Sequence, residues 1–431
     1  MLYNKNILVL GLDSKTLWVA KLLTPDNNVT LVYAEPFSNT ALNELKIDNA
    51  AIVKASSVDD YVDYISSSYD VLIVSSGVRD ITKLKEKARM IGKPILNELE
   101  VSFHYLPNAV NIISVCGKTG RAITASLIYE MLKNDGYNVE LVLEENDSLA
   151  SIISSVKSND YVVINVSEEE LDNIIEYKSN MVVMTNLYNL DKNIMKKALI
   201  NLNEYDTVIV NKEDAELLSL INNINSSIKY FSLKNISDAY YLDGSLYYEK
   251  EKIIDLRQIV LKGLSNYENV LASVCACKEL GVSNSTITKV LSTYKGVKHS
   301  LEYIASLYNV NFYDDSKSSN IKDTINAITA LPGKILLIMG DGKESDLEEL
   351  KSYLKNVLFI ATIGEDRYLI KDFSDRNHIA CEVHEKLEAS VLACYAKAQA
   401  GDNILLSPAY KSEELLGDEF TQIINNLENE G

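Results

Sequence analysis

The chain has 431 residues, and at roughly 100–200 residues per domain this length predicts about three domains. Hydrophobic residues make up 47% and charged residues 24%, an ordinary globular balance that excludes a disordered or collagen-like chain. The net charge of −19 argues against a broad surface for nucleic acid or anionic membranes, because phosphate binding needs clustered cations.

The cysteines and the first residues indicate the compartment. Five cysteines are scattered without a C-x-x-C pair, which favours a reducing cytoplasm, and the four histidines form no cluster with them that would suggest structural zinc. The opening MLYNKNILVLGL runs directly into a short apolar stretch without a small-residue cleavage site. We therefore expect a first strand rather than a signal peptide, and no membrane insertion.

Short apolar runs rich in β-branched residues alternate with helical patterns, which predicts an α/β fold of parallel sheets with crossover helices. In the first block the expected strands are 6–12, 29–35, 50–55, 70–77 and 93–97. The expected helices there are 15–23, 58–66, 81–91 and 97–105. Pro107 marks the predicted end of this block, so the first domain is expected at 1–107.

The second domain is expected at 108–296 and the third at 297–431. Strands of the second are predicted at 110–117, 160–167, 180–186 and 206–212, and its helices at 121–135, 265–280 and 284–293. The polar stretch 222–250 resembles a small antiparallel meander. In the third domain we expect strands at 310–316, 334–342, 356–364 and 402–412, and helices at 319–330, 386–399 and 416–428.

Ligands of open parallel sheets bind at the carboxyl ends of the strands. The first such exit, Gly11 to Thr16, has Asp13 and Thr16 where a dinucleotide fingerprint needs glycines, with Glu35 as the candidate ribose acid. This is a weak signal for NAD, and a plain strand-turn-helix is the favoured interpretation.

The second exit reads Gly117-Lys118-Thr119-Gly120-Arg121-Ala122. Glycines let backbone N–H groups approach phosphate oxygens, the following helix adds its dipole, and Lys118 and Arg121 add positive charge. A P-loop, however, has Lys followed by Ser or Thr at the helix start, where this chain has Arg121 and Ala122. A working phosphate loop and a relic turn of the same geometry both remain open.

The third exit runs from Asp314 to Asn320, with Asp315, Lys317 and several hydroxyls at a helix start. Such a set suits an anion or acyl-phosphate clamp, although plain helix capping by Ser318 or Ser319 is the alternative. The exits 340–343 and 407–412 are expected to converge with it. Asn266 and Asn269 open a helix and would suit a base edge or a cap. No flanking motif supports a hydrolase triad.

These loops, in this order, resemble the Mur ligases over nearly the whole chain, most closely the MurD branch that adds D-glutamate. The resemblance implies a three-domain α/β architecture. It has a Rossmann-like N-terminal domain for a UDP-linked substrate, a central P-loop-type ATPase domain and a Rossmann-like C-terminal domain for the amino acid. The implied reaction is ATP- and Mg²⁺-dependent amide formation through an acyl phosphate, in peptidoglycan precursor synthesis. Other cell-wall enzymes are possible partners by the same resemblance.

The resemblance also assigns roles by position. Lys317 and Asp315 would be catalytic, and Ser319, Lys343 and Ser412 would hold the amino acid. ATP would be bound by the set Gly117, Lys118, Thr119, Gly120, Arg121, Asn266 and Asn269.

Several family positions are changed. Arg121 and Ala122 replace the loop lysine and the metal-binding hydroxyl, and Asn165 stands where a metal-binding glutamate is expected. The segment 186–191 lacks the family histidine, and the modified lysine falls near Ala198. No metal ligands are therefore assigned. Two functions stay open: a divergent ligase, and a catalytically inactive scaffold or regulator. A third reading, a ligase acting on a different acid, follows from the altered uridine-binding segment near residue 35.

Overall fold

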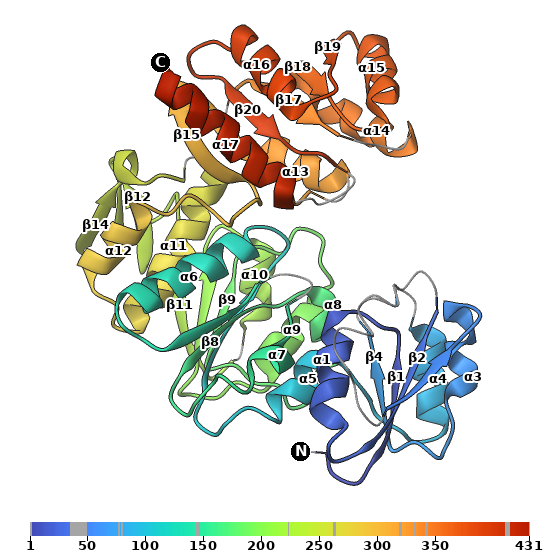
Figure 1. The fold of residues 1–431 in the computed structure, drawn as a ribbon. Coiled ribbons are helices and arrows are strands. Elements are labelled where there is room, and N and C mark those ends of the chain that lie inside the picture. Colours follow the sequence, from blue (N-terminus) through green and yellow to red (C-terminus); the bar gives the residue numbers. More distant parts are fainter. Residues whose placement is uncertain are drawn as a thin grey trace. The chain divides into compact units, whose positions relative to one another are not determined.

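The computed structural model describes residues 2–34, 50–75, 78, 81–143, 147–222, 224–261, 264–318, 321–331, 333–340, 344–409 and 414–430. Three separate sheets follow one another along the chain (Figure 1). The chain divides into two compact units, Met1–Ile253 with Glu268–Ile287, and Ile254–Tyr267 with Thr288–Gly431. The first unit holds the first sheet and most of the second, and the second unit holds the third sheet.

The first sheet has five parallel strands in the order β3-β2-β1-β4-β5. Its strands are β1 (Asn6–Leu10), β2 (Asn28–Tyr33), β3 (Ala50–Lys54), β4 (Val71–Val74) and β5 (Ile95–Leu96). Its helices are α1 (Ser14–Leu23), η1 (Val58–Asp60), α3 (Tyr61–Tyr64), α4 (Thr82–Met90) and α5 (Glu98–Phe103). Alternate residues of β1 face opposite layers: Ile7 packs in the core that includes α1, and Leu8 in the core that includes α4.

The second sheet has nine strands in the order β14-β13-β12-β11-β10-β9-β6-β8-β7. The strands are β6 (Asn111–Cys116), β7 (Val139–Val142), β8 (Tyr161–Asn165), β9 (Met181–Met184), β10 (Thr207–Asn211), β11 (Ser227–Ser232), β12 (Ala239–Leu242), β13 (Ser245–Tyr248) and β14 (Glu251–Asp255). The helices are α6 (Arg121–Asn134), α7 (Leu149–Ile152), α8 (Glu168–Leu171), α9 (Lys192–Ile200), α10 (Ala215–Leu220), η2 (Leu256–Gln258), α11 (Leu264–Glu279) and α12 (Asn284–Leu291).

The antiparallel meander predicted at 222–250 is wrong in part. β11 pairs in parallel with β10, and β12 in parallel with β11, whereas β12 and β13 are antiparallel. For the β10–β11 pair the physical reason is the short helix α10 between the two strands, which the sequence analysis did not identify. A helical crossover returns the chain in the same direction and so permits parallel pairing.

The third sheet has six strands in the order β15-β16-β20-β17-β18-β19, with β15 antiparallel to β16. The strands are β15 (Glu302–Leu307), β16 (Val310–Asp314), β17 (Ile335–Met339), β18 (Val357–Thr362), β19 (Ala380–Val383) and β20 (Asn403–Leu406). The helices are α13 (Ile321–Ala330), α14 (Glu344–Leu350), η3 (Lys351–Asn356), α15 (Arg367–Arg376), α16 (Leu387–Lys397) and α17 (Glu414–Glu430).

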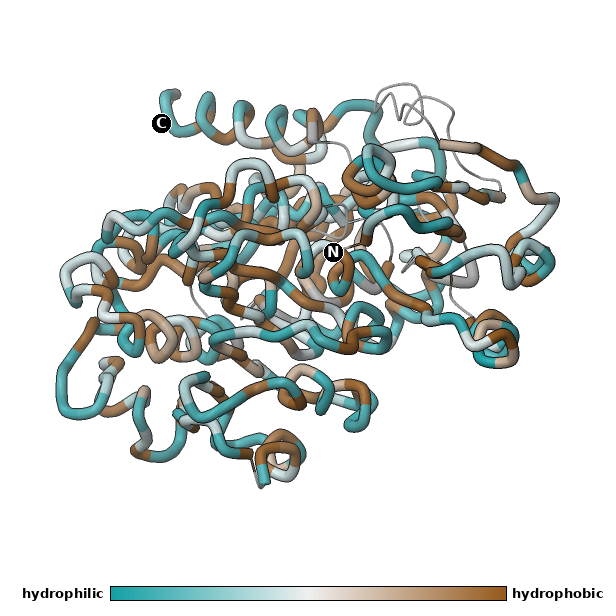
Figure 2. Tube along the Cα trace, turned by 90° about the horizontal axis from the view of Figure 1, so that it is seen from below, coloured by the Kyte–Doolittle hydropathy of each residue, from teal (hydrophilic) through white to brown (hydrophobic). Residues whose placement is uncertain are grey.

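Helix α17 shows how this domain closes its core. Its apolar residues recur at helical spacing, so Phe420 and Ile424 are fully buried against the third sheet. Figure 2 shows the resulting alternation of hydrophobic and hydrophilic colour along the helix that leads to the C-terminus. In the described parts of the chain, no helix is long and apolar enough to cross a membrane.

Candidate active site

The loop after β6 contains two glycines with positive φ. Gly117 has φ +140° and Gly120 φ +78°, so both glycines adopt conformations that other residues rarely take. A Cβ atom at Gly117 would meet Thr185 Oγ1 and lie 2.9 Å from the Asn186 carbonyl oxygen. A Cβ at Gly120 would meet the side chain of Asn269. The glycines therefore permit close approach by other parts of this chain.

Two residues that the sequence analysis did not single out for this role fill the loop. Asn186 is buried after β9, and its Oδ1 accepts the N–H groups of Lys118 and Thr119, both at 3.0 Å. Its Nδ2 donates to the Thr119 carbonyl oxygen at 3.0 Å. Thr185 Oγ1 donates to the same oxygen at 2.8 Å. Two N–H groups that a P-loop directs at phosphate are thus already bonded to protein.

Arg121 begins α6, where the family lysine is expected. Its Nη1 donates to the Val166 carbonyl oxygen at 2.7 Å, beyond the end of β8. Because a guanidinium carries five N–H donors, this bond leaves others for a phosphate. Lys118 is exposed. The loop therefore keeps positive charge, in a different form from the family pattern.

The residues beside this loop do not fit Mg²⁺ in the family manner. Ala122 offers no oxygen, and Asn165 donates from Nδ2 to the Leu143 carbonyl oxygen at 2.7 Å, while its buried Oδ1 has no partner in the described structure. Glu168 accepts the Asp191 N–H at 2.6 Å. Ala198, at the modified-lysine position, is in the apolar core. We therefore derive no step through a protein-held metal here.

The predicted adenine-facing residues lie on α11. Asn269 is buried beside Gly120, so the structure brings it to the phosphate loop. Asn266 lies one turn earlier on the same helix. The geometry supports the pairing of Asn269 with the loop and leaves the role of Asn266 a prediction.

The exit of β16 holds a buried carboxyl. Asp315 Oδ2 accepts from Ser407 Oγ at 2.9 Å, and Oδ1 accepts the Leu301 N–H at 3.0 Å. Burial raises the pKa of Asp315 to about 8 despite these bonds. Ser407 Oγ also lies 2.9 Å from Ser318 Oγ. Because Ser407 follows β20, the predicted convergence of these two strand exits is confirmed.

Lys317 follows in the same loop, and its backbone N–H donates to the His299 carbonyl oxygen at 3.0 Å. The two predicted catalytic residues thus lie together. The three predicted amino-acid-binding residues, Ser319, Lys343 and Ser412, lie outside the described residues, so their role stays a prediction.

Neighbouring side chains pack against the exit of β1 and hydrogen-bond its polar groups. Asp13 forms a capping box with Thr16 and accepts from Ser75 Oγ at 2.5 Å. A Cβ at Gly11 would lie 2.8 Å from Val78. Lys15 forms a buried ion pair with Glu170 at 2.6 Å. This is the strand-turn-helix that the sequence favoured over a dinucleotide loop, and Glu35 lies outside the described residues.

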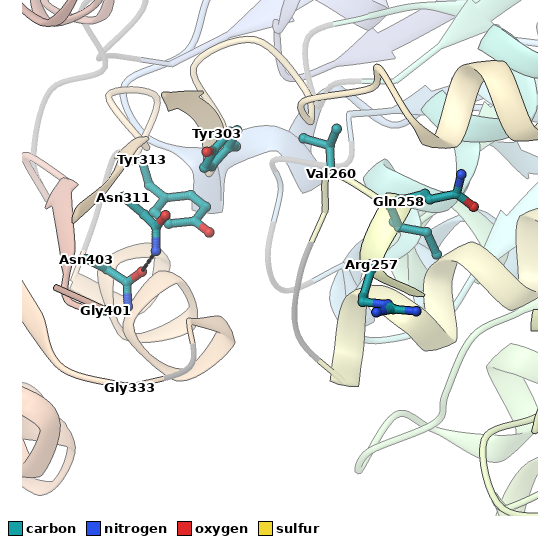
Figure 3. Close-up of a pocket in the computed structure, with 10 residues that line it drawn as sticks. Arg257, Gln258, Val260, Tyr303, Asn311, Tyr313, Gly333, Gly401 and Asn403 are labelled. Atoms are coloured by element: carbon teal, nitrogen blue, oxygen red, sulfur yellow. Dashed lines mark hydrogen bonds between the residues drawn. The ribbon is translucent and has the colours of Figure 1, made fainter. Parts of the chain in front are cut away.

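A pocket of about 490 Å³ lies within the second unit (Figure 3). Tyr303, Tyr313, Asn311 and Asn403 line one side, and Asn311 Nδ2 donates to Asn403 Oδ1 at 3.2 Å. Asn311 and Asn403 stand at the amino ends of β16 and β20. The pocket therefore opens at the opposite end of these strands from Asp315 and Ser407.

The sequence matches no family model, but it aligns along its whole length with known ligases. It is 30% identical over 447 residues to the UDP-N-acetylmuramoylalanine–D-glutamate ligase of Bacillus mycoides, covering 98% of each chain. It is 27% identical over 448 residues to the enzyme of the same name from Bacillus pumilus, covering 99% of each.

Solved structures share the fold. The UDP-N-acetylmuramate–alanine ligase MurC of Thermotoga maritima superposes with a TM-score of 0.57 at 17% identity, covering 99% of this chain and all of that one. MurF ligase of the same organism, in complex with ADP, gives a TM-score of 0.54 at 14% identity, covering 99% and 96%. These likenesses establish the three-domain architecture. Together with the full-length sequence match, they show that the chain belongs to the Mur ligase family, on its MurD-like branch.

Proposed function

We propose that this protein is an ATP-dependent amide ligase of peptidoglycan precursor synthesis that joins D-glutamate to a UDP-N-acetylmuramoyl-L-alanine-type carboxylate. The observation that supports it most is the full-length match to ligases of this name, at 27–30% identity. The cluster of Asp315, Lys317 and Ser407 at adjoining strand exits is consistent with this assignment, because it gathers charged and hydroxyl groups where family substrates are expected.

In this reaction a carboxylate oxygen of the precursor attacks the γ-phosphorus of ATP and ADP departs. The amino group of D-glutamate then attacks the acyl carbon, loses a proton and expels phosphate. Arg121 and Lys118 would neutralise phosphate charge at the loop. Lys317 would do so at the acyl phosphate, and Asp315, protonated near neutral pH, would donate a hydrogen bond. Mg²⁺ accompanying ATP would supply further neutralisation of the phosphate charge.

The direct test is product formation in a mixture of protein, ATP, Mg²⁺, UDP-N-acetylmuramoyl-L-alanine and D-glutamate. We expect phosphate release and a product one glutamyl residue heavier by mass spectrometry, each requiring all substrates. Replacing D-glutamate with L-glutamate or D-alanine tests the amino acid, and replacing the precursor with UDP-N-acetylmuramate tests the acid. Phosphate release with another acid, and none with this precursor, would redirect the proposal to a different substrate.

The second candidate is a scaffold or regulator that has lost the chemistry. Ala122 and Asn165 at metal-binding positions favour it, as does the pairing of Asn186 with two loop N–H groups. A rebuilt variant, Arg121→Lys with Ala122→Thr and Asn165→Glu, separates the two. If the native chain is inactive and the rebuilt chain turns over, the loss of function lies at this loop. If the native chain is active and the rebuilt one gains little, the ligase works with its altered loop.

A further inference from the structure

A second polar cluster lies beside the Asp315 loop and takes no part in the reaction proposed above. His299, which precedes β15, and Asp314, which ends β16, are almost completely buried. His299 Nδ1 lies 2.7 Å from Asp314 Oδ2. Glu302 Oε2 accepts a hydrogen bond from the backbone N–H of His299 at 2.9 Å. One imidazole and two carboxylates thus face the same small volume within the second unit.

The donor atoms are spaced as ligands of one ion. One ligand atom each from His299, Glu302 and Asp314 lies within 4.8 Å of the other two. Zinc binds histidine nitrogen and carboxylate oxygen at about 2.0–2.2 Å, so two ligands of one ion are ~3–4 Å apart. Only small side-chain movements separate the observed arrangement from coordination.

A fourth group points into the cluster without a partner. Ser316 is fully buried, and its Oγ has no hydrogen bond to any residue that the structure describes. The surroundings of Gly417, in the first turn of α17, show where the Ser316 hydroxyl lies. A Cβ there would meet His299 Nδ1, Ser316 Oγ and, at 2.5 Å, Asp314 Oδ2, so all three atoms surround one point. A buried hydroxyl left unbonded costs about 1–3 kcal/mol, and such a group calls for an ion or a water beside it.

The charges around the cluster also favour a cation. Glu302, Asp314 and Asp418 are acidic, and Lys298 pairs with Asp418 at 2.9 Å. His299 Nε2 lies 3.4 Å from Asp418 Oδ1 and has no hydrogen bond in the described structure. A fully buried carboxylate such as Asp314 needs a positive partner. A divalent ion with a neutral imidazole would balance the charges of Asp314 and Glu302.

We propose that His299, Glu302 and Asp314 bind a first-row divalent transition ion of the Zn²⁺ class, with the Ser316 hydroxyl facing the open coordination position. The imidazole favours such an ion over Mg²⁺ or Ca²⁺, which prefer oxygen ligands. The ion would join the loop before β15, the end of β16 and, through Ser316, the loop that carries Asp315. It would hold that loop in place and would leave the phosphate chemistry to other residues.

The test uses the full chain without a histidine tag, stripped with a chelator, in the absence of nucleotide and substrates. Co²⁺ is titrated while the visible absorption is recorded, and Zn²⁺ is titrated by calorimetry. We expect one ion per chain, ligand-field bands from bound Co²⁺ and loss of those bands when Zn²⁺ is added. Because the readout needs no turnover, an inactive enzyme that binds the ion would refute the ligase proposal alone.

Variants assign the binding to this cluster. Asp314→Asn keeps a hydrogen-bond acceptor for His299 and nearly the same shape, so we expect it to fold, as circular dichroism would check. Asp314→Asn and Glu302→Gln should each weaken Zn²⁺ binding at least about tenfold. Asp418→Asn, which removes a neighbouring acid outside the ligand set, should change it less than about threefold. The proposal is overturned if the native chain shows no saturable binding, or if both ligand variants bind as tightly as it does.

Discussion

The loop at 117–121 and the strand exit at 314–318 differ in how far their polar groups are hydrogen-bonded within the protein. In the loop, Asn186 and Thr185 bond the backbone of Lys118 and Thr119. In the strand exit, Asp315 is buried with a raised pKa, and Ser316 Oγ lacks a hydrogen-bond partner in the described structure. The first region is satisfied by the chain itself, whereas the second contains groups that are costly to bury unless something else binds them.

This difference follows the family pattern. Ala122 and Asn165, which stand where the resemblance predicts metal ligands, lie at or beside the self-satisfied loop. Asp315 and Lys317, which the resemblance predicts to be catalytic, lie in the strand exit. A loop that no longer positions a protein-bound metal can have its backbone hydrogen-bonded by side chains of the same chain. We infer that the loop at 117–121 has diverged further than the strand exit.

The largest expected effect is at Gly117. Gly117→Ala would force a side chain into a positive-φ position and against Thr185 and the Asn186 backbone, so we expect about 2–4 kcal/mol lower unfolding free energy. Gly136→Ala is the matched control, because Gly136 also has positive φ but has nothing within 4 Å of an added Cβ. Urea unfolding of both variants measures the difference. Equal losses would show that the loop is not closely packed.

The next effect tests whether Asn186 holds the loop. Asn186→Ala leaves the N–H groups of Lys118 and Thr119 without their side-chain acceptor, which should cost about 1–3 kcal/mol. Asn193→Ala, at an exposed position on α9, should stay within about 0.5 kcal/mol of the native chain. A negligible loss at Asn186 would contradict the self-satisfied loop.

The strand exit makes a pH-dependent prediction. The pKa of Asp315 is about 8 in the folded chain and near 3.8 when unfolded, so the folded state holds the extra proton between these values. The stabilisation is complete below about pH 4 and is lost as the pH rises towards 8. Compared with the native chain, Asp315→Asn should lose about 1 kcal/mol less stability between pH 7 and pH 8. Denaturant midpoints across that range check this, and parallel profiles would argue against the buried acid.

The smallest effect is at Lys118, whose side chain is exposed. Lys118→Ala should leave the unfolding free energy within about 0.5 kcal/mol, whereas Arg121→Ala should cost about 1 kcal/mol through its lost bond to the Val166 carbonyl. Thermal unfolding of both variants measures the contrast. A larger loss at Lys118 than at Arg121 would reverse the roles given to these two cations.

Much of the fold could be predicted from the sequence, because buried strands such as Ile335–Met339 are continuous apolar runs with helical patterns between them. Short elements could not: β7, β15, β19 and α10 are only four to six residues long, too short for a periodic pattern to identify them. The domain boundaries at 107 and 296 remain predictions. The two compact units do not follow them, since Ile254–Tyr267 groups with the second unit.

Some residues of the candidate site could likewise be predicted from the sequence, and others could not. The glycine loop, Asp315 and Lys317 could be found because their motifs are continuous in sequence. The convergence of exit 407–412 with the Asp315 loop could also be predicted, whereas Asn186 and Thr185 reach the glycine loop only because β6 lies beside β9 in the sheet. In the sequence, Asn186 only begins the segment 186–191, which lacks the family histidine. Its bonds to the loop could not be inferred from that position.

Calorimetric titration of ATP, with and without Mg²⁺, on the native chain and Arg121→Ala tests the proposed ligase activity at its altered loop most directly. We expect saturable ATP binding that Arg121→Ala weakens about tenfold or more, because each charge-assisted phosphate contact contributes about 1.5–3 kcal/mol. Mg²⁺ should change the affinity little, since the described residues beside the loop offer it no family-type ligands. Absence of ATP binding at millimolar concentration would contradict the ligase proposal and leave the scaffold as the better description.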